Sequence, residues 1–582
     1  MLYLNLLHRP AEHPSQREAF AWQQQLAHTL GLKVTLLVDY RSLDDAATVA
    51  ALQHDAATFG DELGLWFMNL PPVDDDTADA DGRQEPFLWL YTAAEKRRII
   101  AQVLARFETV FGFQPASVGA YHLDAESLCI LTELAPTVQI AVAGCFEEGV
   151  RVFHGCNHSW YLFTEGMPWA PWYPAKTNSL RPAADETDAL GIVAVPHLSR
   201  DLALSYEGRN DFFATHPANV QRAMANAGAE NPYMFNLVDQ QRLQADFNDG
   251  FAYTHVFVGP AWIAGDPSVQ DADAVTRQLY ADFLRYFVEL RSQGEAIDMH
   301  MDEFAAWFRE HIPIGKPQVA LAKELLYGAE KHYFWYLDSA CRVLVDPTQG
   351  GAIGDLRPYA AQVAAHTGAD ADTLWYGSYP YLIQSQHRTG NSHHYADGAR
   401  TTLRLTRHDE TIDLAHVRVR VAAVTRDAGA TIVRLTPATA HFSDGVAVTV
   451  ETTYRFAGQG RIAIERRLLA GDTVMAEEYV KACYGVTEYP EDLRGVVLQV
   501  EGAQPGELVY AYRSRTLRTA AASAVTALIP PIEARLRLHA ETPRQEGTAT
   551  EGYLFSPYFT LTLTTPLHVG EMLRTWLTIE KA

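Results

Sequence analysis

Two aspartates that stand just beyond apolar runs are the residues best suited to chemistry in this chain. Asp124 follows the run Ser117–Leu123, and Asp201 comes shortly after the run Gly191–His197. Two carboxylates can break a glycosidic bond, one attacking the anomeric carbon and the other protonating the leaving oxygen. Asp124 also precedes a helical pattern, so capping that helix by accepting its free N–H groups explains it equally well.

Other polar and aromatic residues stand at or just past the ends of predicted strands. The carboxyl ends of parallel strands share one face, and this is the face where α/β barrels bind their ligands. For any single histidine in this group, a hydrogen-bonded place in the core is the favoured explanation, and the convergence of several polar groups is more informative than any one of them. The candidates for substrate binding on this face are His8, Asp39, Trp66, His122, Arg200, His255 and Trp262.

One irregular segment, His154–Ala183, is rich in aromatic residues that prolines interrupt. Proline fixes the backbone and removes a donor, so this segment is neither a helix nor a central strand. Flat aromatic faces held by prolines suit stacking against a sugar, and the alternative is a hydrophobic plug at a barrel mouth. The candidates for sugar contact in this segment are Trp160, Trp169, Trp172, Tyr173, Lys176 and Asn178.

The first 310 residues contain the elements that must position these side chains. Apolar runs alternate there with segments of helical period, which is typical of a parallel α/β domain. The predicted strands are Leu2–Leu7, Lys33–Asp39, Leu63–Asn69, Ser117–Leu123, Val138–Gly144, Gly191–His197 and Tyr253–Gly259. The predicted helices are Gln16–Leu30, Ala93–Phe111, Val275–Ser292 and Met299–Ile312. Seven strands with intervening helices favour a closed or nearly closed (β/α)7-type barrel.

The chain changes character beyond residue 312. Lys316–Val345 and Asp355–Thr367 have helical periodicity, which predicts a helical connector. From about residue 371, polar and apolar residues alternate in short runs separated by turns such as Asp444-Gly445, as in an antiparallel β-sandwich. We therefore predict a barrel domain at 1–312, a helical connector at 313–370 and a β-sandwich domain at 371–582.

Composition excludes several classes of partner. A net charge of −24 argues against binding to a phosphate backbone. The five cysteines form no CxxC pair, and the trio His154, Cys156 and His158 lacks a fourth metal ligand. No apolar run has the length of a membrane helix, and the amino terminus is typical of a first strand rather than a signal peptide. We predict a cytoplasmic protein without metal, cofactor, nucleic-acid or membrane partner, and leave homo-oligomerisation open.

The order of barrel, connector and sandwich resembles the glycoside hydrolase/deacetylase superfamily, which includes family 57 amylases, family 38 α-mannosidases and polysaccharide deacetylases. The first strand, LNLLHRP, looks like the His-x-Pro start of family 57, and VGAYHLDAES is similar to the fourth-strand motif of that family. SVGAYHLDAESL and PWAPWYPAKTNSLRPA together resemble more closely a group of uncharacterised bacterial proteins. The match implies that Asp124 takes the place of the nucleophile, although family 57 uses Glu there.

Two departures from this superfamily affect the expected chemistry. Deacetylases carry paired Asp on the first strand and His-x3-His after the third, where this chain has His8 and GLWFMNLPP. Family 57 places its acid on the seventh strand, where YTHVFVGPAW holds no carboxylate, so Asp201 becomes the first choice, with Asp266 and Glu126 in reserve. We expect a glycoside hydrolase that binds a carbohydrate substrate. The alternatives are a metal-dependent carbohydrate deacetylase and a non-catalytic carbohydrate-binding protein.

Overall fold

The structure, a computed structural model, consists of two compact units. Its described residues are 1–11, 14–71, 88–120, 122–144, 166–206, 232–264, 272–325, 328, 330–365, 379–384, 398–485, 492–553 and 557–582. The first unit comprises Met1–Ser205, Arg209–Gly315 and Ala364–Ser378, and the second comprises Tyr206–Gly208, Lys316–Val363 and Tyr379–Ala582. The three-domain division and its boundaries stay a prediction.

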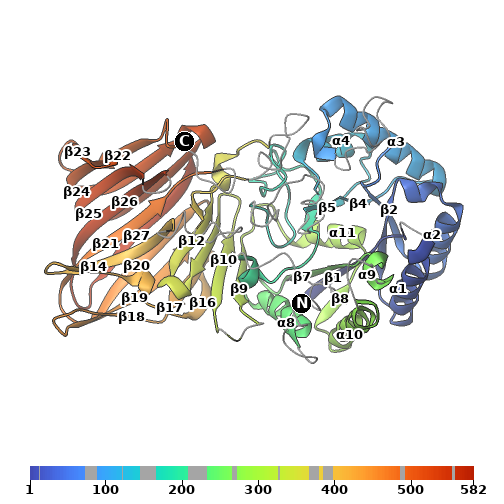
Figure 1. Ribbon diagram of the computed structural model, residues 1–582, viewed down its shortest axis with the longest axis horizontal. Coiled ribbons are helices and arrows are strands. Elements are labelled where there is room, and N and C mark those ends of the chain that lie inside the picture. Colours follow the sequence, from blue (N-terminus) through green and yellow to red (C-terminus); the bar gives the residue numbers. More distant parts are fainter. Residues whose placement is uncertain are drawn as a thin grey trace. The chain divides into compact units, whose positions relative to one another are not determined.

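A parallel sheet of eight strands forms the centre of the first unit (Figure 1). Its order is β6-β5-β4-β3-β2-β1-β7, and β8 also pairs with β1. The strands are β1 (Leu2–His8), β2 (Val34–Asp39), β3 (Glu62–Trp66), β4 (Ser117–Gly119), β5 (Ile140–Gly144), β6 (Val193–Pro196), β7 (Ala252–Phe257) and β8 (Ala296–Asp298). All seven predicted strands are present, and the short β8 is an addition to them.

The two outer ends of this sheet are joined by hydrogen bonds just beyond β6. The His255 N–H on β7 donates to Ser199 Oγ at 2.8 Å, and the Ser199 N–H donates to the His255 carbonyl at 3.4 Å. These bonds bring the end of β6 beside β7. Among the described residues no strand ladder joins β6 to β7, so the parallel sheet is a curled half-barrel whose two edges approach each other at Ser199. This agrees with the α/β part of the predicted fold class.

Helices surround the parallel strands and confirm the four helices predicted in the first 312 residues. They are α1 (Arg17–Thr29), α2 (Ala46–Phe59), α3 (Ala93–Phe111), α4 (Ala125–Leu134), α6 (Leu202–Tyr206), α8 (Tyr233–Leu243), α9 (Pro260–Ala264), α10 (Ala272–Ser292) and α11 (Met301–His311). Their ends follow local sequence. Thr92 and Glu95 form a capping box at the start of α3, and Gly112 ends that helix with a φ of 84°.

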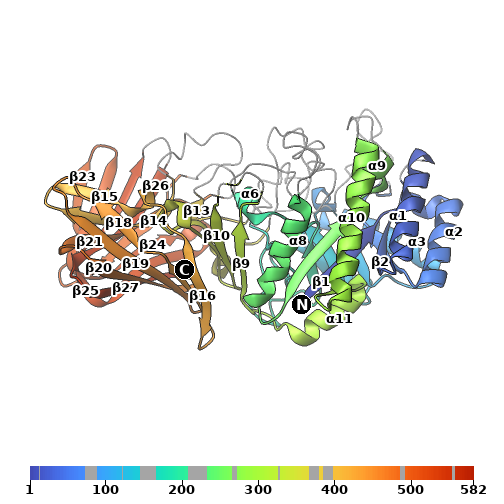
Figure 2. The ribbon, with the colours of Figure 1, turned by 90° about the horizontal axis from the view of Figure 1, so that it is seen from below.

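Helix α11 covers the amino end of the half-barrel. In Figure 2 it lies beside the start of the chain, and α9, which follows the carboxyl end of β7, lies at the opposite end of the unit. The Trp307 ring lies 3.9 Å from the Tyr3 ring on β1 and stacks at 5.5 Å on Phe251 before β7. This aromatic packing closes the amino end of the half-barrel.

The second unit is built from two antiparallel sheets. The larger has fourteen strands, β14 (Arg400–Arg407), β15 (Glu410–Asp413), β16 (Val421–Asp427), β17 (Ala430–Leu435), β18 (Ala438–His441), β19 (Ala447–Phe456), β20 (Arg461–Ala470), β21 (Val474–Ala482), β22 (Val497–Glu501), β23 (Glu507–Ala511), β24 (Ser514–Ile529), β25 (Ala534–Tyr553), β26 (Pro557–Leu567) and β27 (Met572–Lys581). The antiparallel β content of this part of the chain agrees with the prediction.

The predicted helical connector is wrong. In its place stands a sheet of five strands, β9 (Gln318–Lys323), β10 (His332–Leu337), β11 (Arg342–Asp346), β12 (Ala352–Arg357) and β13 (Ile383–Gln384). Phe334 and Tyr336 on β10 contact the Phe456 ring of the larger sheet at 5.5 and 4.5 Å. Five consecutive residues of β10 are buried, and such a run lacks the alternation that identifies a strand, so it is read as easily as a helix.

Among the described residues, no helix is both long enough and apolar enough to cross a membrane.

Candidate functional site

The carboxyl ends of four strands bring one cation and three rings together inside the half-barrel. We call Arg9, Trp66, His197 and Phe257 the aromatic floor. The Arg9 guanidinium lies 5.4 Å from the centre of the Trp66 ring and 5.3 Å from that of Phe257. His197 lies 5.8 Å from Trp66 and 4.7 Å from Phe257, and the last two rings meet edge to face at 5.0 Å.

Local sequence explains why these side chains meet. Residues of a strand alternate between its two faces, so Arg9 shares the inward face of β1 with Leu7. Gly119 on β4 pairs in register with Trp66, and a Cβ at residue 119 would lie 2.7 Å from the indole. Because Gly119 has no side chain, the Trp66 ring has room to extend across the interior of the half-barrel.

Asp39 adds a carboxylate beside the aromatic floor. It is the register partner of Trp66 between β2 and β3, so the two side chains leave the sheet on the same face. Asp39 accepts hydrogen bonds from the Ser42 hydroxyl at 2.7 Å and from Asn69 Nδ2 at 3.3 Å. Among the described residues, Trp66, His197, Phe257 and Asp39 are buried, and Arg9 is partly exposed. Flat rings, a guanidinium and a carboxylate are the groups that hold the apolar faces and the hydroxyl groups of a sugar.

Asp124 lies beyond β4, where it caps helix α4 and forms an ion pair with the buried Lys96. It is 1% exposed, and its carboxylate accepts from the Ser127 N–H at 3.3 Å, which caps α4. Lys96 Nζ on α3, which is fully buried, donates to Asp124 at 2.6 Å and to Glu126 at 2.7 Å. The helix-cap explanation is therefore confirmed, and the Lys96 ammonium adds the opposite charge that a buried carboxylate needs.

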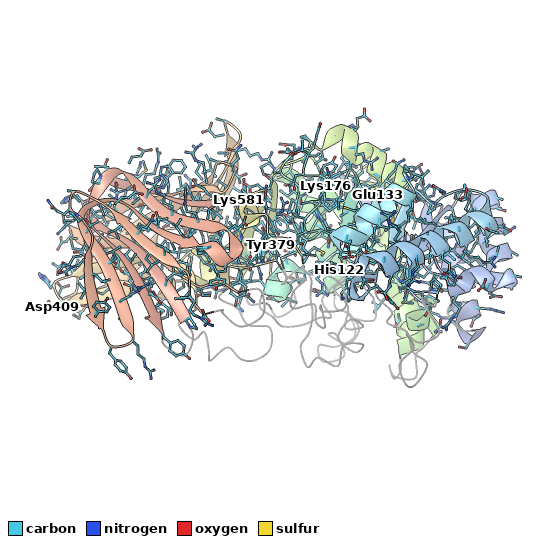
Figure 3. The ribbon with its side chains drawn as sticks, turned by 90° about the horizontal axis from the view of Figure 1, so that it is seen from above. His122, Glu133, Lys176, Tyr379, Asp409 and Lys581 are labelled. Carbon is cyan, nitrogen blue, oxygen red and sulfur yellow. The ribbon has the colours of Figure 1, made fainter. Side chains whose placement is uncertain are left out.

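His122 lies in the same layer beside Asp124 and is labelled in Figure 3. Its Nδ1 is 3.2 Å from the Ala143 carbonyl, and its ring meets Trp89 edge to face at 5.4 Å. Burial lowers the pKa of His122 and outweighs the opposing effect of the Asp124 charge. A neutral ring that donates through Nδ1 leaves Nε2 as an acceptor.

Asp201 lies beyond β6 and is fully buried. Its carboxylate accepts from the Ala203 N–H at 3.0 Å, from the Leu204 N–H at 3.1 Å and from the Tyr233 hydroxyl at 2.9 Å. Three donors around one carboxylate suit its charged form. The neighbouring Arg200 is also buried, at 6% exposure.

Two of the predicted histidines are held by structural hydrogen bonds. His8 bonds side chains outside the half-barrel, and His255 bonds the backbone. His8 points outward from β1, where its ring nitrogens bond the side chains of Gln24 on α1 and Tyr280 on α10. His255 Nδ1 is 2.7 Å from the Pro196 carbonyl. Burial lowers the pKa of each histidine to about 4, so both rings are neutral at neutral pH.

The aromatic segment after β5 serves mainly as structure where it is described. Trp172 donates from Nε1 to the Ser179 carbonyl at 2.9 Å, and the Tyr173 hydroxyl donates to the Ile312 carbonyl just past α11. These contacts place Tyr173 near the amino end, not with the aromatic floor.

The remaining candidates of this segment divide by exposure. Trp169 is half-buried, whereas Asn178 is buried and accepts from the Leu180 N–H at 3.0 Å. Lys176 is exposed and donates to the Thr187 carbonyl at 2.6 Å. Trp160 and the side chain of Trp262 lie outside the described residues, as does the trio His154, Cys156 and His158.

Sequence reasoning missed Arg9, His197, Phe257 and Lys96. The first three share a detectable signal. Each is either the last residue of its strand or the residue just after the strand, and each lies on the inward face. Lys96 carried no such signal, since it is one of several charged residues on a helix. For metal binding, no group of three or more His, Cys, Asp or Glu side chains is arranged suitably within the described residues.

Comparison with known proteins adds distant likenesses. No family model and no curated protein matches the chain. It is similar to a protein from Parabacteroides distasonis assigned as a glycoside hydrolase/deacetylase, with 13% identity and a TM-score of 0.44 over 64% of this chain and 88% of the other. It is also similar to the 4-alpha-glucanotransferase from Thermococcus litoralis, with 7% identity and a TM-score of 0.29 over 100% of both chains. A third likeness is to a protein from Mycobacterium smegmatis assigned as a polysaccharide deacetylase, with 11% identity and a TM-score of 0.30 over 54% of this chain and 92% of the other. At these values the likenesses carry no conclusion about activity.

Proposed function

We propose that the first unit binds a carbohydrate at the carboxyl end of its half-barrel and hydrolyses a glycosidic bond there. The observation that carries the proposal is the aromatic floor with Asp39 beside it. A sugar presents an apolar ring face to aromatic side chains and hydroxyl groups to a guanidinium and a carboxylate. Strand ends β1, β2, β3, β6 and β7 contribute these groups, as ligand sites of α/β barrels require.

Asp124 is the proposed nucleophile. A nucleophilic carboxylate has to be charged when the substrate binds, and the ion pair with Lys96 at 2.6 Å is formed by that charged state. Attack on the anomeric carbon would form a covalent glycosyl-enzyme intermediate, as in retaining glycosidases. The Lys96 ammonium would hold the carboxylate in one orientation before the attack.

Asp201 is the proposed acid and base. In a retaining mechanism one carboxyl group protonates the leaving oxygen first and then, once charged, activates the water that releases the sugar. The three donors around Asp201 suit the charged form that acts in the second step. Among the three donors, the Tyr233 hydroxyl is the one that can rotate when Asp201 takes up the proton for the first step.

A second candidate function, carbohydrate binding without hydrolysis, is favoured by a specific observation. Asp124 and Asp201 are both buried, and both carboxylates are occupied by the N–H groups of the helices that they cap. If these bonds persist with a sugar bound, the aromatic floor would bind the sugar and no bond would break.

A screen of aryl glycosides and unsubstituted oligosaccharides, paired with a glycan array, separates these functions. Hydrolysis predicts release of the aryl group or of new reducing ends by the full chain. Binding on the array without any release supports the second candidate function. If a broad panel showed no binding and no release, this result would contradict the proposal that this face binds carbohydrate.

A further inference from the structure

The first unit has a second concave site on the outside of the half-barrel, between α1 and α2. This pocket has a volume of about 500 Å³, which lies within the range of small-molecule sites. Its lining includes Phe20, Gln24, His28, Ala51, Asp55 and Phe59. None of these residues belongs to the aromatic floor or to the proposed catalytic pair.

A chain of buried hydrogen bonds fixes the polar floor of this pocket. Tyr280 and Gln24 bond the two ring nitrogens of His8, and the amide nitrogen of Gln24 donates to Asp61 at 3.0 Å and to Asp55 at 3.1 Å. The Gln24 amide oxygen therefore faces His8, and its NH2 group faces the two carboxylates. This chain holds Asp55 in place at the pocket.

Asp55 differs from the other carboxylates near the pocket. The Asp61 carboxylate lies 2.9 Å from His28 Nε2, and the Asp45 carboxylate pairs at 2.7 Å with Arg17, which also lines the pocket. Asp55 is half-buried, and within the part of the chain that the structure describes it has a hydrogen bond from Gln24 and no ion pair. A half-buried carboxylate beside apolar walls is complemented best by a cationic donor.

The walls around Asp55 define the rest of the ligand. Ala21, Ala47 and Ala51 line the two helices with methyl groups. Phe59 is 51% exposed and stacks on His28 with ring centres 3.7 Å apart, so a large part of the Phe59 side chain remains open. An aromatic ring and small apolar side chains accept an apolar body, and the ring face also attracts a cation.

We propose that the pocket between α1 and α2 binds an organic ammonium ion, with its ammonium group on Asp55 and its apolar body between the two helices. Binding there is separate from carbohydrate binding at the carboxyl end of the half-barrel. Isothermal titration calorimetry of the full chain tests it with phenethylammonium and with 2-phenylethanol, which has the same ring but no charge. We expect the ammonium ion to bind about tenfold more tightly than the alcohol, or better, because a charge-assisted bond is lost with the alcohol.

Two variants locate the binding. Asp55→Asn should weaken phenethylammonium about tenfold and leave the alcohol unchanged, because only the charge is removed. Ala51→Trp should abolish binding of both by filling the pocket, whereas Ala50→Trp, at the exposed neighbouring position of α2, should change nothing. Equal affinity for ammonium and alcohol, absence of binding, or unchanged binding in Ala51→Trp would each overturn the proposal. Loss in Ala51→Trp with no effect of Asp55→Asn would also overturn it, because the ligand would not be cationic.

Discussion

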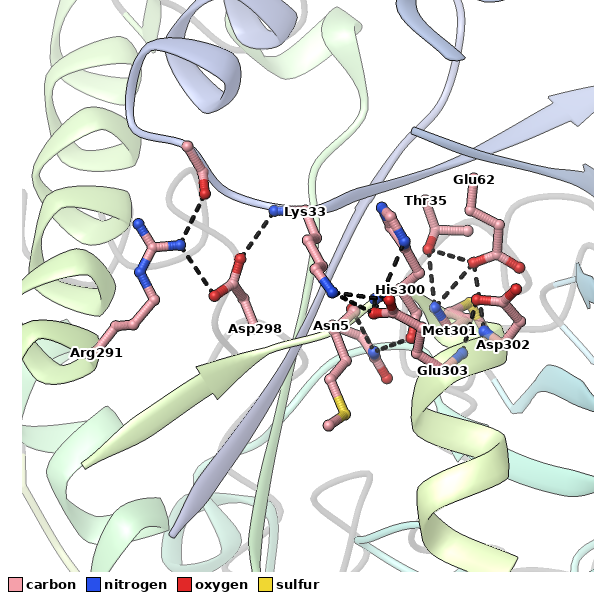
Figure 4. Close-up of polar contacts among 12 residues, drawn as sticks. Asn5, Lys33, Thr35, Glu62, Arg291, Asp298, His300, Met301, Asp302 and Glu303 are labelled. Atoms are coloured by element: carbon pink, nitrogen blue, oxygen red, sulfur yellow. Dashed lines mark hydrogen bonds and ion pairs between the residues drawn. The ribbon is translucent and has the colours of Figure 1, made fainter. Parts of the chain in front are cut away.

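Buried polar groups have different partners at the two ends of the parallel sheet. At the amino end, the Glu62 carboxylate on β3 accepts from the Thr35 hydroxyl at 2.8 Å, from the Met301 N–H at 2.9 Å and from the Asp302 N–H at 3.4 Å (Figure 4). It also accepts from the Ser117 hydroxyl. All of these donors are hydroxyl groups or backbone amides, and two belong to the first turn of α11. The Glu62 carboxylate thus fastens a helix to the sheet.

At the carboxyl end, cations and ring faces are present in addition to hydroxyl and backbone-amide donors. Lys96 bonds Asp124, and Arg9 lies over Trp66 and Phe257. A carboxylate held by a helix amino terminus contributes to stability, as Asp124 and Asp201 also do at the carboxyl end. The Arg9 guanidinium and the rings beside it come from separate strands and meet at the face where α/β barrels bind their ligands. These additional groups distinguish the carboxyl end as the candidate site.

Removing Lys96 should have the largest effect on stability. Lys96→Met leaves Asp124 buried without its cation, and we expect a loss of about 3–5 kcal/mol in the free energy of unfolding. The matched control is Lys33→Met at the amino end, where the Lys33–Glu303 ion pair is about half exposed and a loss below about 1 kcal/mol is expected. Chemical denaturation of both variants measures the difference. Similar losses in the two would show that the buried ion pair has no special role.

Glu62 should make stability depend on pH. Burial, and then the neighbouring Asp302 charge, raise the pKa of Glu62 from 4.5 to about 7, so the folded chain holds this proton more tightly than the unfolded chain. The resulting stability is fully present below pH 4.5 and is lost as the pH rises to about 7, with an upper limit of about 3 kcal/mol.

Glu62→Gln should remove this slope, because the amide does not titrate. Unfolding free energies of wild type and variant, measured between pH 4.5 and 7, should converge or cross as the wild type loses stability. Glu310→Gln on the exposed side of α11 serves as the control. A constant difference between wild type and Glu62→Gln across this window would mean that Glu62 does not titrate there.

Removing Arg9 should affect carbohydrate binding more than stability. Its effect on the free energy of unfolding should be the smallest of these substitutions. Its side chain is partly exposed, so Arg9→Met should change the free energy of unfolding by less than about 1 kcal/mol. The loss of the guanidinium from the aromatic floor should weaken carbohydrate binding about tenfold. Affinity on the best glycan from the array measures this. Unchanged affinity would remove Arg9 from the site.

The sequence predicted the parallel sheet well because its strands are buried on both faces and alternate with helices. Strand β10 shows the limit of the same reasoning, because a buried apolar run such as Tyr333–Leu337 has no period of its own. What distinguishes it is its pairing with β9 and β11, which are brought beside it only by the fold.

The candidate site was predicted in part for a similar reason. Choosing His8 over Arg9 at the end of β1 depends on which face of the strand is inward, and a shift by one residue exchanges the two faces. The neighbours of β1 settle this, because His8 contacts α1 and α10 while Arg9 lies over Trp66. The bond from Lys96 to Asp124 joins residues 28 positions apart, and no local pattern indicates it.

The turnover of Asp124→Asn tests the central claim most directly. The variant keeps the size and one acceptor oxygen of the side chain, so binding of the best oligosaccharide to the aromatic floor should stay within about twofold of wild type. If Asp124 is the nucleophile, kcat on that oligosaccharide should fall by about 100-fold or more. Full activity in Asp124→Asn, with the oligosaccharide still bound, would contradict the account.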